Sequence, residues 1–179
     1  MAKKEVALIT GGGTGIGFAI AKKLHSMNKT VVLTGRRKEK LLQAKKILKT
    51  RCHILEHDIS RLETIPKLVI DIEKKIGPIN YLINNAGMHL RKIAVETTDE
   101  EWKNVIDTNL NSVFSLSREC AKKMIRRKKG NIILVGSVTT IMGLPDVTAY
   151  ATSKTALSGL ARTLATVSYT HLRAHETSL

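Results

Sequence analysis

Cysteine and proline are scarce in this chain. Cys52 and Cys120 are the two cysteines among 179 residues, and neither has the spacing of a metal-binding motif. Their apolar sequence neighbours predict buried, reduced thiols, as is usual in a cytoplasmic protein. Three prolines and the absence of low-complexity segments predict short connections and exclude a long linker. We therefore expect a single domain.

Long apolar runs are also absent. No stretch approaches the length of a membrane-spanning helix, and no signal-peptide pattern precedes the first strand pattern. We therefore expect a soluble, cytoplasmic protein with no membrane partner. Hydrophobic residues nevertheless make up 42% of the chain, which is enough for one sizeable core.

Acidic residues are outnumbered by basic ones, 15 to 30, which gives a formal charge of +15. Such an excess can indicate a nucleic-acid-binding protein. However, aromatic residues make up only 3% of the chain, and the lysines are spread over nearly every predicted helix. We interpret the charge as a solvated surface and expect no nucleic-acid partner.

Strand-like and helix-like apolar patterns alternate along the chain. Strand patterns occupy residues 5–10, 31–34, 52–56, 81–84 and 131–136. Helix patterns occupy a segment after the first strand and residues 38–50, 61–76, 99–128 and 150–166. This alternation predicts an α/β fold, with a doubly wound parallel sheet that carries helices on both faces.

A glycine-rich segment, TGGGTGIG at residues 10–17, connects the first strand pattern to the first helix pattern. Gly11, Gly15 and Gly17 would let backbone amides approach a pyrophosphate at the start of the helix, where an anion is favoured. The spacing differs from the G-x-G-x-x-G fingerprint of other dinucleotide-binding folds. A tight turn that binds nothing is the alternative interpretation.

Tyr150 and Lys154 are four residues apart in a segment with helical periodicity, so their side chains lie on one helix face. A nearby ammonium favours the phenolate, which lets a tyrosine donate and accept protons near neutral pH. Ser137, at the end of the preceding strand, could hold a substrate carbonyl against that phenol. The pattern indicates interconversion of a ketone and an alcohol. A lysine beside a half-buried ring, without catalysis, is the alternative.

The order of these features resembles the short-chain dehydrogenase/reductase family from about residue 4 to about residue 166. The motifs, in order along the chain, are the glycine segment, NNAG at residues 84–87, Asn109, Ser137 and the Tyr150/Lys154 pair. The resemblance implies a Rossmann-type fold and hydride transfer between a nicotinamide dinucleotide and a ketone or secondary alcohol. It implies that the catalytic residues are Asn109, Ser137, Tyr150 and Lys154, with Asn109 supporting a water relay.

The same resemblance implies a set of cofactor contacts, with Asp58 and Ile59 at the adenine. The full set is Thr10, Gly11, Gly13, Thr14, Gly15, Ile16, Gly17, Arg36, Arg37, Asp58, Ile59, Asn85, Ala86, Gly87, Tyr150 and Lys154.

The end of the second strand indicates which cofactor is preferred. An Asp or Glu there accepts from the ribose of NAD, whereas an Arg accommodates the 2′-phosphate of NADP. Here the strand runs into Arg36 and Arg37, with no acid before Glu39. We predict that NADP(H) is preferred and NAD(H) possible, with Arg36 binding the phosphate, assisted by Arg37 or Thr34. A solvated basic helix start is the alternative.

Two substrate classes and one non-catalytic role remain open. The segment from Ser137 to Gly143 is similar to that of 3-oxoacyl-[acyl-carrier-protein] reductases, whose substrate is attached to an acidic carrier protein. Residues 88–92 instead resemble loops of polyol and sugar-acid dehydrogenases, such as gluconate 5-dehydrogenase. A cofactor-binding interaction module is the third alternative, although such a module would be expected to have lost a catalytic residue.

A basic cluster at the end of the long predicted helix would help to dock the acidic carrier, as in the similar reductases. Cations at this place also complement the helix dipole without any partner. The cluster consists of Lys122, Lys123, Arg126, Arg127, Lys128 and Lys129.

The last thirteen residues, 167–179, lose the helical period and resemble the translated adapter of a sequencing library. We expect residues 1–166 to form the NADP-binding domain with the catalytic residues, and the tail to be non-native. His171 and His175 are spaced like metal ligands, but no third ligand accompanies them, so we expect no metal site.

Relatives continue beyond this point into two more strands and the segment that caps the substrate. We therefore expect the last strands to be missing, one edge of the sheet to be open and the chain to be poorly active. The resemblance implies that the full-length form is a homo-oligomer, a tetramer.

Overall fold

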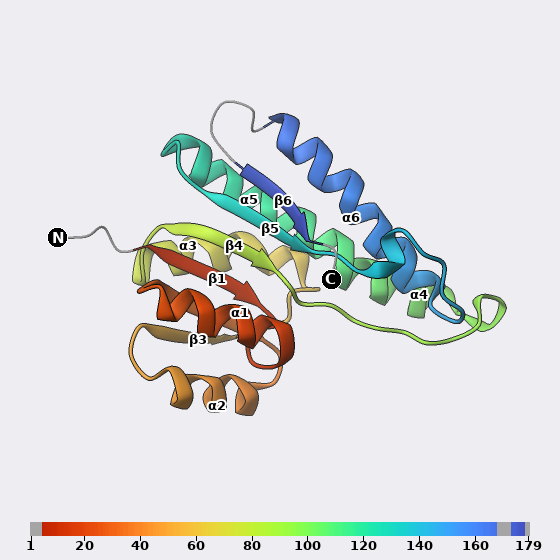
Figure 1. The fold of residues 1–179 in the computed structure, drawn as a ribbon, viewed down its shortest axis with the longest axis horizontal. Helices are drawn as coiled ribbons and strands as arrows, with labels where there is room; N and C mark the ends of the chain where they lie inside the picture. Colours follow the sequence, from red (N-terminus) through yellow and green to blue (C-terminus); the bar gives the residue numbers. More distant parts are fainter. Residues whose placement is uncertain (1–4, 168–172, 178–179) are drawn as a thin grey trace.

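Parallel strands form the centre of the computed structural model, which describes residues 5–167 and 173–177. Six strands pair in the order β3-β2-β1-β4-β5-β6 within this part of the chain (Figure 1). The strands are β1 Val6–Thr10, β2 Thr30–Gly35, β3 Cys52–Glu56, β4 Ile79–Asn84, β5 Asn131–Val135 and β6 Arg173–Thr177. The chain reverses its direction of winding between β1 and β4, which leaves a crevice at their carboxyl ends. The predicted doubly wound α/β sheet is confirmed.

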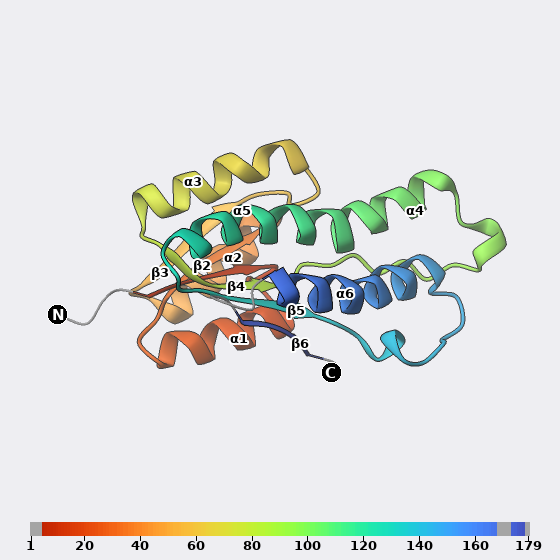
Figure 2. The same cartoon turned by 90° about the horizontal axis from the view of Figure 1, so that it is seen from above.

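Helices cover both faces of the sheet, and the alternation of side chains along β1 shows how. Val6 and Leu8 pack on one side, in a core with α3 Ile65–Lys75, α5 Ser112–Arg126 and α6 Thr148–Val167. Ala7 and Ile9 pack on the other, with α1 Gly15–Ser26 and α2 Lys38–Leu48. Figure 2 shows α3, α5 and α6 on one side and α1 on the other. Both faces of β1 are therefore buried, as in other parallel sheets.

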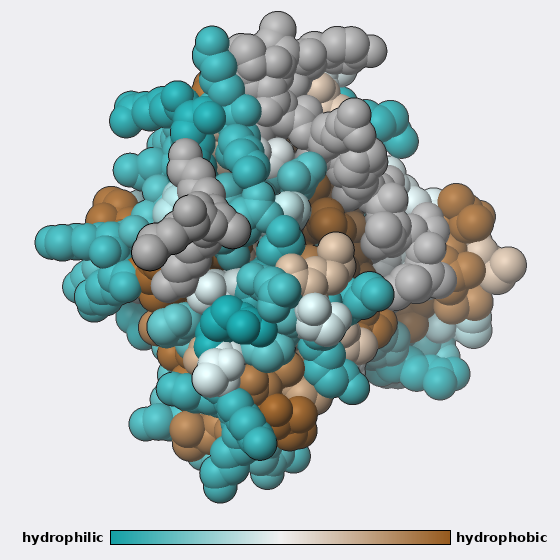
Figure 3. All heavy atoms as spheres, turned by 60° about the vertical axis from the view of Figure 1, so that its left-hand side comes forward, coloured by the Kyte–Doolittle hydropathy of each residue, from teal (hydrophilic) through white to brown (hydrophobic). Residues whose placement is uncertain are grey.

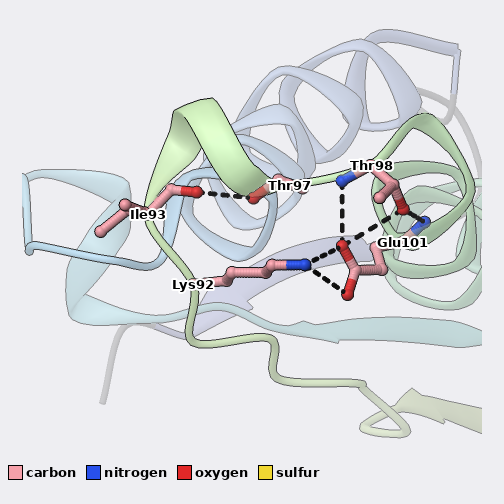
Figure 4. Close-up of polar contacts among 5 residues, drawn as sticks. All are labelled: Lys92, Ile93, Thr97, Thr98 and Glu101. Carbon is pink, nitrogen blue, oxygen red and sulfur yellow. Dashed lines mark hydrogen bonds and ion pairs between the residues drawn. The ribbon is translucent and has the colours of Figure 1, made fainter.

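The predicted helix at residues 99–128 contains a π-helical turn. The first part, α4 Asp99–Ile106, continues through the turn Asp107–Asn111 into α5. The start of α4 is a capping box, in which the Glu101 amide donates to Thr98 Oγ1 at 3.2 Å and Glu101 Oε2 accepts from the Thr98 amide at 2.9 Å (Figure 4). The sequence pattern predicted the helix but not the extra residue of its π turn.

β6 was not predicted from the sequence. It pairs in parallel with β5, from Asn131 opposite Arg173 to Val135 opposite Thr177. Parallel pairing uses backbone groups alone, so a segment without a strand-like side-chain pattern can still extend a sheet. β5 is therefore not the outer strand: β6 ends the described sheet, and the predicted open edge lies along it. The non-native origin of residues 167–179 stays a prediction, and the side chains of His171 and His175 lie outside the described residues.

Three members of the basic cluster form internal ion pairs. Lys122 Nζ lies 2.9 Å from Glu119, Arg127 Nη1 2.7 Å from Glu73, and Lys129 Nζ 2.6 Å from Glu5. Glu5 also accepts from Lys29 and Tyr81, and these contacts, led by Lys129, lower its pKa to about 2. Within the described residues, Lys123, Arg126 and Lys128 form no ion pair.

The basic cluster lies at the edge where the strands begin, because Arg127 also donates to the carbonyl of Ile79, the first residue of β4. Figure 3 shows the side of the molecule that is on the left in Figure 1, where hydrophilic side chains predominate and smaller hydrophobic patches lie among them. None of the helices in residues 5–167 combines the length and apolar character needed to cross a membrane.

The two cysteines are buried and free, as predicted. Burial raises the pKa of the Cys52 thiol to about 11 and also raises the pKa of Cys120. A thiol in such surroundings stays protonated, so both residues act as small apolar core side chains.

Candidate active site

Two adjoining cavities open at the carboxyl edge of the sheet. The first, of about 290 Å³, is lined by Thr10, Gly11, Gly13, Thr14, Thr34, Gly35, Arg36, Arg37, Lys40, Leu41, His57, Asp58, Ile59, Asn85, Ala86, Gly87 and Thr108. The second, of about 320 Å³, is lined by Ile16, Asn85, Gly87, Met88, His89, Val135, Gly136, Ser137, Tyr150 and Lys154. Both contain Asn85 and Gly87, so one extended ligand could occupy the two.

Most of the residues predicted as cofactor contacts line one of these cavities. Gly15, Gly17 and Asn109 line neither. The sequence argument missed several further lining residues, although many directly flank predicted ones, as His57 flanks Asp58. The residues not predicted as site residues are Gly35, Lys40, Leu41, His57, Thr108, Met88, His89, Val135 and Gly136.

A set of hydrogen bonds joins the ends of β1 and β4. Thr10 Oγ1 accepts from the amides of Asn85 and Ala86 at 3.0 and 2.9 Å. Asn85 Nδ2 donates in return to the carbonyls of Thr10 and Gly11, at 2.9 and 3.3 Å. The two side chains are thus engaged with the protein itself, and they hold the glycine segment beside the segment that follows β4.

Gly17 lies where α1 passes closest to this set of bonds. A Cβ on Gly17 would stand 2.4 Å from the Gly11 carbonyl oxygen and 2.5 Å from Asn85 Nδ2. Such distances are far below van der Waals contact, so Gly17 is required for packing of the helix against the strand end. Its role in the structure is close approach of backbones within the protein, although it lines neither cavity.

The start of α1 fits a bound anion. Gly15 has φ +54°, which favours glycine, and a Cβ there would meet no atom within 4 Å. Thr14 caps the helix without a side-chain hydrogen bond, and the first turn contains no acidic residue. The first cavity is lined by Gly13 and Thr14, directly before this turn, so the free amides at the start of α1 could bind an anion there without a competing negative charge.

Polar groups at the end of β2 surround the other side of the first cavity. Arg37 Nη2 donates to Thr14 Oγ1 at 3.2 Å, and Arg36 is exposed at the cavity wall. Thr34 Oγ1 is buried and has no hydrogen-bond partner among the described residues. Burial by itself would raise the pKa of Asp58, but hydrogen bonds from Ser60 and the nearby Arg36 charge hold it below its ordinary value. This end of the cavity therefore combines an exposed guanidinium, that of Arg36, with a hydroxyl that has no partner in the described part of the chain.

The second cavity contains Ser137, Tyr150 and Lys154. Lys154 is only 5% exposed, its Nζ donates to the Val135 carbonyl at 2.7 Å, and burial lowers its pKa. The same Nζ lies 5.8 Å from the centroid of the Tyr150 ring, which confirms that the two side chains share one helix face. Ser137 is extended and begins the 3₁₀ turn Val138–Thr140, with its Oγ accepting from the Thr139 amide at 3.2 Å.

Asn109, in the π turn, is completely buried and holds two segments together. Its Oδ1 accepts from the Met88 amide at 2.7 Å, and its Nδ2 donates to the Met88 carbonyl at 2.9 Å and to Ser153 Oγ at 3.0 Å. Ser153 in turn donates to the Tyr150 carbonyl at 2.6 Å. The observed contacts of Asn109 therefore position the segment after β4 against the first turns of α6. The water relay stays a prediction.

Residues 5–166, whose side chains are described, contain no group of three or more His, Cys, Asp or Glu residues that could hold a metal ion.

A profile of the short chain dehydrogenase family matches residues 5–174. The chain is 36% identical over 161 residues to the 3-oxoacyl-[acyl-carrier-protein] reductase FabG of Rickettsia bellii, covering 90% of this chain and 65% of the relative. It is 36% identical over 159 residues to nodulation protein G of a Rhizobium species, covering 89% and 65%. The chain thus spans about two thirds of the length of these curated relatives.

Among solved structures, a metagenomic short-chain oxidoreductase in complex with NADP is similar to this chain. The TM-score is 0.93 at 31% sequence identity, with 97% of this chain and 81% of the other covered.

The close approach at Gly17 generates a stability prediction with a matched control. Gly17→Ala should lower the free energy of unfolding by about 1 to 3 kcal/mol, because the added methyl overlaps the Gly11 carbonyl. Gly159→Ala, also inside a helix but with nothing within 4 Å of the new Cβ, should raise it by up to about 1 kcal/mol. Urea unfolding of both variants measures the difference. Equal effects would show that the packing at Gly17 is unimportant.

Proposed function

The chain belongs to the short-chain dehydrogenase family, and we propose that it is an oxidoreductase transferring hydride between NADP(H) and a ketone or secondary alcohol. The observation that carries this proposal is the pair of adjoining cavities. One contains the glycine segment and the arginines, and the other contains Ser137, Tyr150 and Lys154. Their shared residues, Asn85 and Gly87, lie where a dinucleotide would pass from one to the other.

The first cavity would hold the cofactor. The amides at the start of α1 would bind the pyrophosphate, and Arg36 with Thr34 would bind the 2′-phosphate. The nicotinamide end would lie in the second cavity, beside Gly87, Tyr150 and Lys154. When bound, this group supplies or accepts the hydride.

The protein's own residues would handle the proton. The Tyr150 hydroxyl donates its proton to the carbonyl oxygen as negative charge develops there, and the Ser137 hydroxyl donates a hydrogen bond to the same oxygen. The Lys154 ammonium, held at the Val135 carbonyl, stabilises the phenolate that remains. In the reverse direction, the phenolate removes the proton from an alcohol.

Tyr150→Phe tests this assignment. The substitution removes only the transferable proton, so ketone reduction should fall by at least about a hundredfold, as for loss of a general acid. Binding of NADPH, measured by fluorescence titration, should change little. Lys154→Ala should weaken both NADPH binding and turnover, since it also removes a cation from the cavity that would hold the nicotinamide end of the cofactor. A Phe variant as active as the unmutated protein would exclude Tyr150 as the proton donor and would favour the non-catalytic alternative.

The preference for NADP(H) rests on three groups at the end of β2. Arg36 is exposed at the cavity wall, Arg37 is anchored to Thr14, and the Thr34 hydroxyl lacks a partner in the described part of the chain. A phosphate at this cavity wall would pair with Arg36, and Thr34 and Arg37 line the same cavity. This combination supports a phosphate site more strongly than a solvated helix start.

Arg36→Asp should reverse the preference. The substitution removes the phosphate's partner and adds an acceptor for the ribose hydroxyl of NAD. Loss of a charge-assisted hydrogen bond costs about 1.5 to 3 kcal/mol, so affinity for NADPH should fall more than about tenfold. Arg162→Asp, with the same charge change on the exposed part of α6, should leave both affinities unchanged. Equal affinity of the unmutated protein for the two cofactors in the same titration would contradict the assignment.

We further propose that the substrate is a 3-oxoacyl group on an acidic carrier protein. Two observations support this: the similarity to the Rickettsia reductase and the three basic-cluster residues that form no ion pair within the described residues, Lys123, Arg126 and Lys128. The three ion-paired members of the cluster are engaged with Glu119, Glu73 and Glu5, so their charges are partly neutralised. A polyol or sugar-acid dehydrogenase is the alternative, and efficient reduction of a keto sugar acid would favour it.

Charge reversal separates carrier docking from a structural role. Replacing Lys123, Arg126 and Lys128 together by Glu should slow reduction of the carrier-bound substrate and spare a small soluble analogue. Added salt should have the same effect on the unmutated protein. The control reverses Lys23, Lys45 and Lys46 on α1 and α2, which lie on the opposite face of the sheet. Equal slowing of both substrates would instead indicate a structural role of the three cations.

A further inference from the structure

His89 lies in the catalytic cavity and has no role in the reaction described above. Its ring centroid is 4.7 Å from that of Tyr150, with the two planes tilted by 49°. The side chain is exposed and lines the cavity together with Ser137, Tyr150 and Lys154. An imidazole therefore lies beside the phenol that handles the proton.

The backbone on one side of His89 is fixed by Asn109. Both the amide and the carbonyl of Met88, the preceding residue, bond to the Asn109 side chain, at 2.7 and 2.9 Å. Since Asn109 is completely buried, this anchor belongs to the core of the protein.

The backbone on the other side is fixed by Lys92. Its amide donates to the Asp146 carbonyl at 2.7 Å, and it forms a parallel bridge with Val147, just before α6. Its ammonium contacts both carboxylate oxygens of Glu101, at 3.0 and 2.9 Å, and Glu101 is also the capping-box residue of α4 (Figure 4). Anchors at residues 88 and 92 therefore restrict the backbone on both sides of His89.

The other side-chain hydrogen-bond donors of this cavity are already engaged, whereas Asn85 Oδ1 can only accept. Ser137 and Tyr150 are assigned to the reacting oxygen, Lys154 bonds to the Val135 carbonyl, and Asn85 Nδ2 bonds to the glycine segment. The remaining lining residues are apolar or glycine. Among the described lining residues, His89 is thus the side-chain donor that is left to bond to a second oxygen of a substrate.

We propose that His89 is a specificity-determining residue, whose imidazole donates a hydrogen bond to a second oxygen of the substrate, on a carbon close to the reacting carbonyl. The inference rests on the proposed function, since it names the class of ketone that the site takes. A ketone with a neighbouring ester or thioester carbonyl has such an oxygen, and so does a hydroxyketone. A simple aliphatic ketone has none, and it would displace water from the imidazole without replacing the hydrogen bond.

The test uses two variants that separate the ring from its hydrogen bond. His89→Phe retains an aromatic ring against Tyr150 and removes the donor, whereas His89→Gln removes the ring and retains a donor. The substrates are ethyl acetoacetate, which has a second carbonyl, dihydroxyacetone, which has hydroxyls beside its carbonyl, and 2-hexanone, which has neither. The measured quantities are kcat and KM for each ketone with NADPH, and the affinity of each variant for NADPH.

We expect His89→Phe to lower kcat/KM roughly threefold to tenfold for ethyl acetoacetate, for dihydroxyacetone or for both, which is the effect of one lost hydrogen bond. The same variant should leave NADPH affinity unchanged and should not lower kcat/KM for 2-hexanone, and His89→Gln should retain most of the selectivity. Whichever bifunctional ketone is affected identifies the place of the second oxygen.

An equal loss for all three ketones in His89→Phe would overturn the proposal, because it would mean that His89 only positions Tyr150. No loss for any ketone would overturn it as well. Failure of the unmutated protein both to bind NADPH and to reduce any of the three, or a range of other ketones, would instead refute the proposed function itself. The two failures are therefore distinguishable.

Discussion

The hydrogen bonds between the Thr10 hydroxyl and the amides of Asn85 and Ala86 are the interaction on which the candidate site depends. They join the ends of two neighbouring parallel strands whose connecting helices leave on opposite faces of the sheet. Because the chain leaves β1 towards one face of the sheet and β4 towards the other, a crevice remains at the carboxyl ends of these strands. Gly17 of α1 approaches the same bonded groups closely, and both cavities share Asn85 and Gly87, in the segment that follows β4.

Buried polar groups provide the second constraint. Asn109 and Lys154 are both almost fully buried, and each is paired with backbone carbonyls of a neighbouring segment. Leaving either group unpaired would cost its full desolvation energy, so these bonds favour one arrangement of the loops around the catalytic cavity. The residues that the family resemblance marks as catalytic are therefore also residues that organise the site.

The positive charge of the chain has more than one use. Some of the cations form ion pairs at the edge of the sheet where the strands begin. There Glu5 pairs with Lys29 and Lys129 and accepts a hydrogen bond from the Tyr81 hydroxyl. Glu73 pairs with Arg127 at the same edge. Another part, Arg36 and Arg37, lies at the opposite edge, beside the cavity that would hold a phosphate. A net charge by itself does not distinguish these uses, because ion pairing depends on which carboxylates the fold brings within reach.

The sequence by itself determined the strand and helix alternation, the doubly wound sheet and the order of the motif residues, because apolar periods and local spacings are properties of neighbouring positions. It also placed Tyr150 beside Lys154, since the spacing of a helix is enough for that. Only the tertiary structure decided that Asn109 holds Met88 and that half of the basic cluster is ion-paired. The pairing of β6 with β5 and the contact of His89 with Tyr150 were likewise decided there. These contacts join residues far apart in the chain or use backbone groups that every residue has, so no local pattern of side chains encodes them.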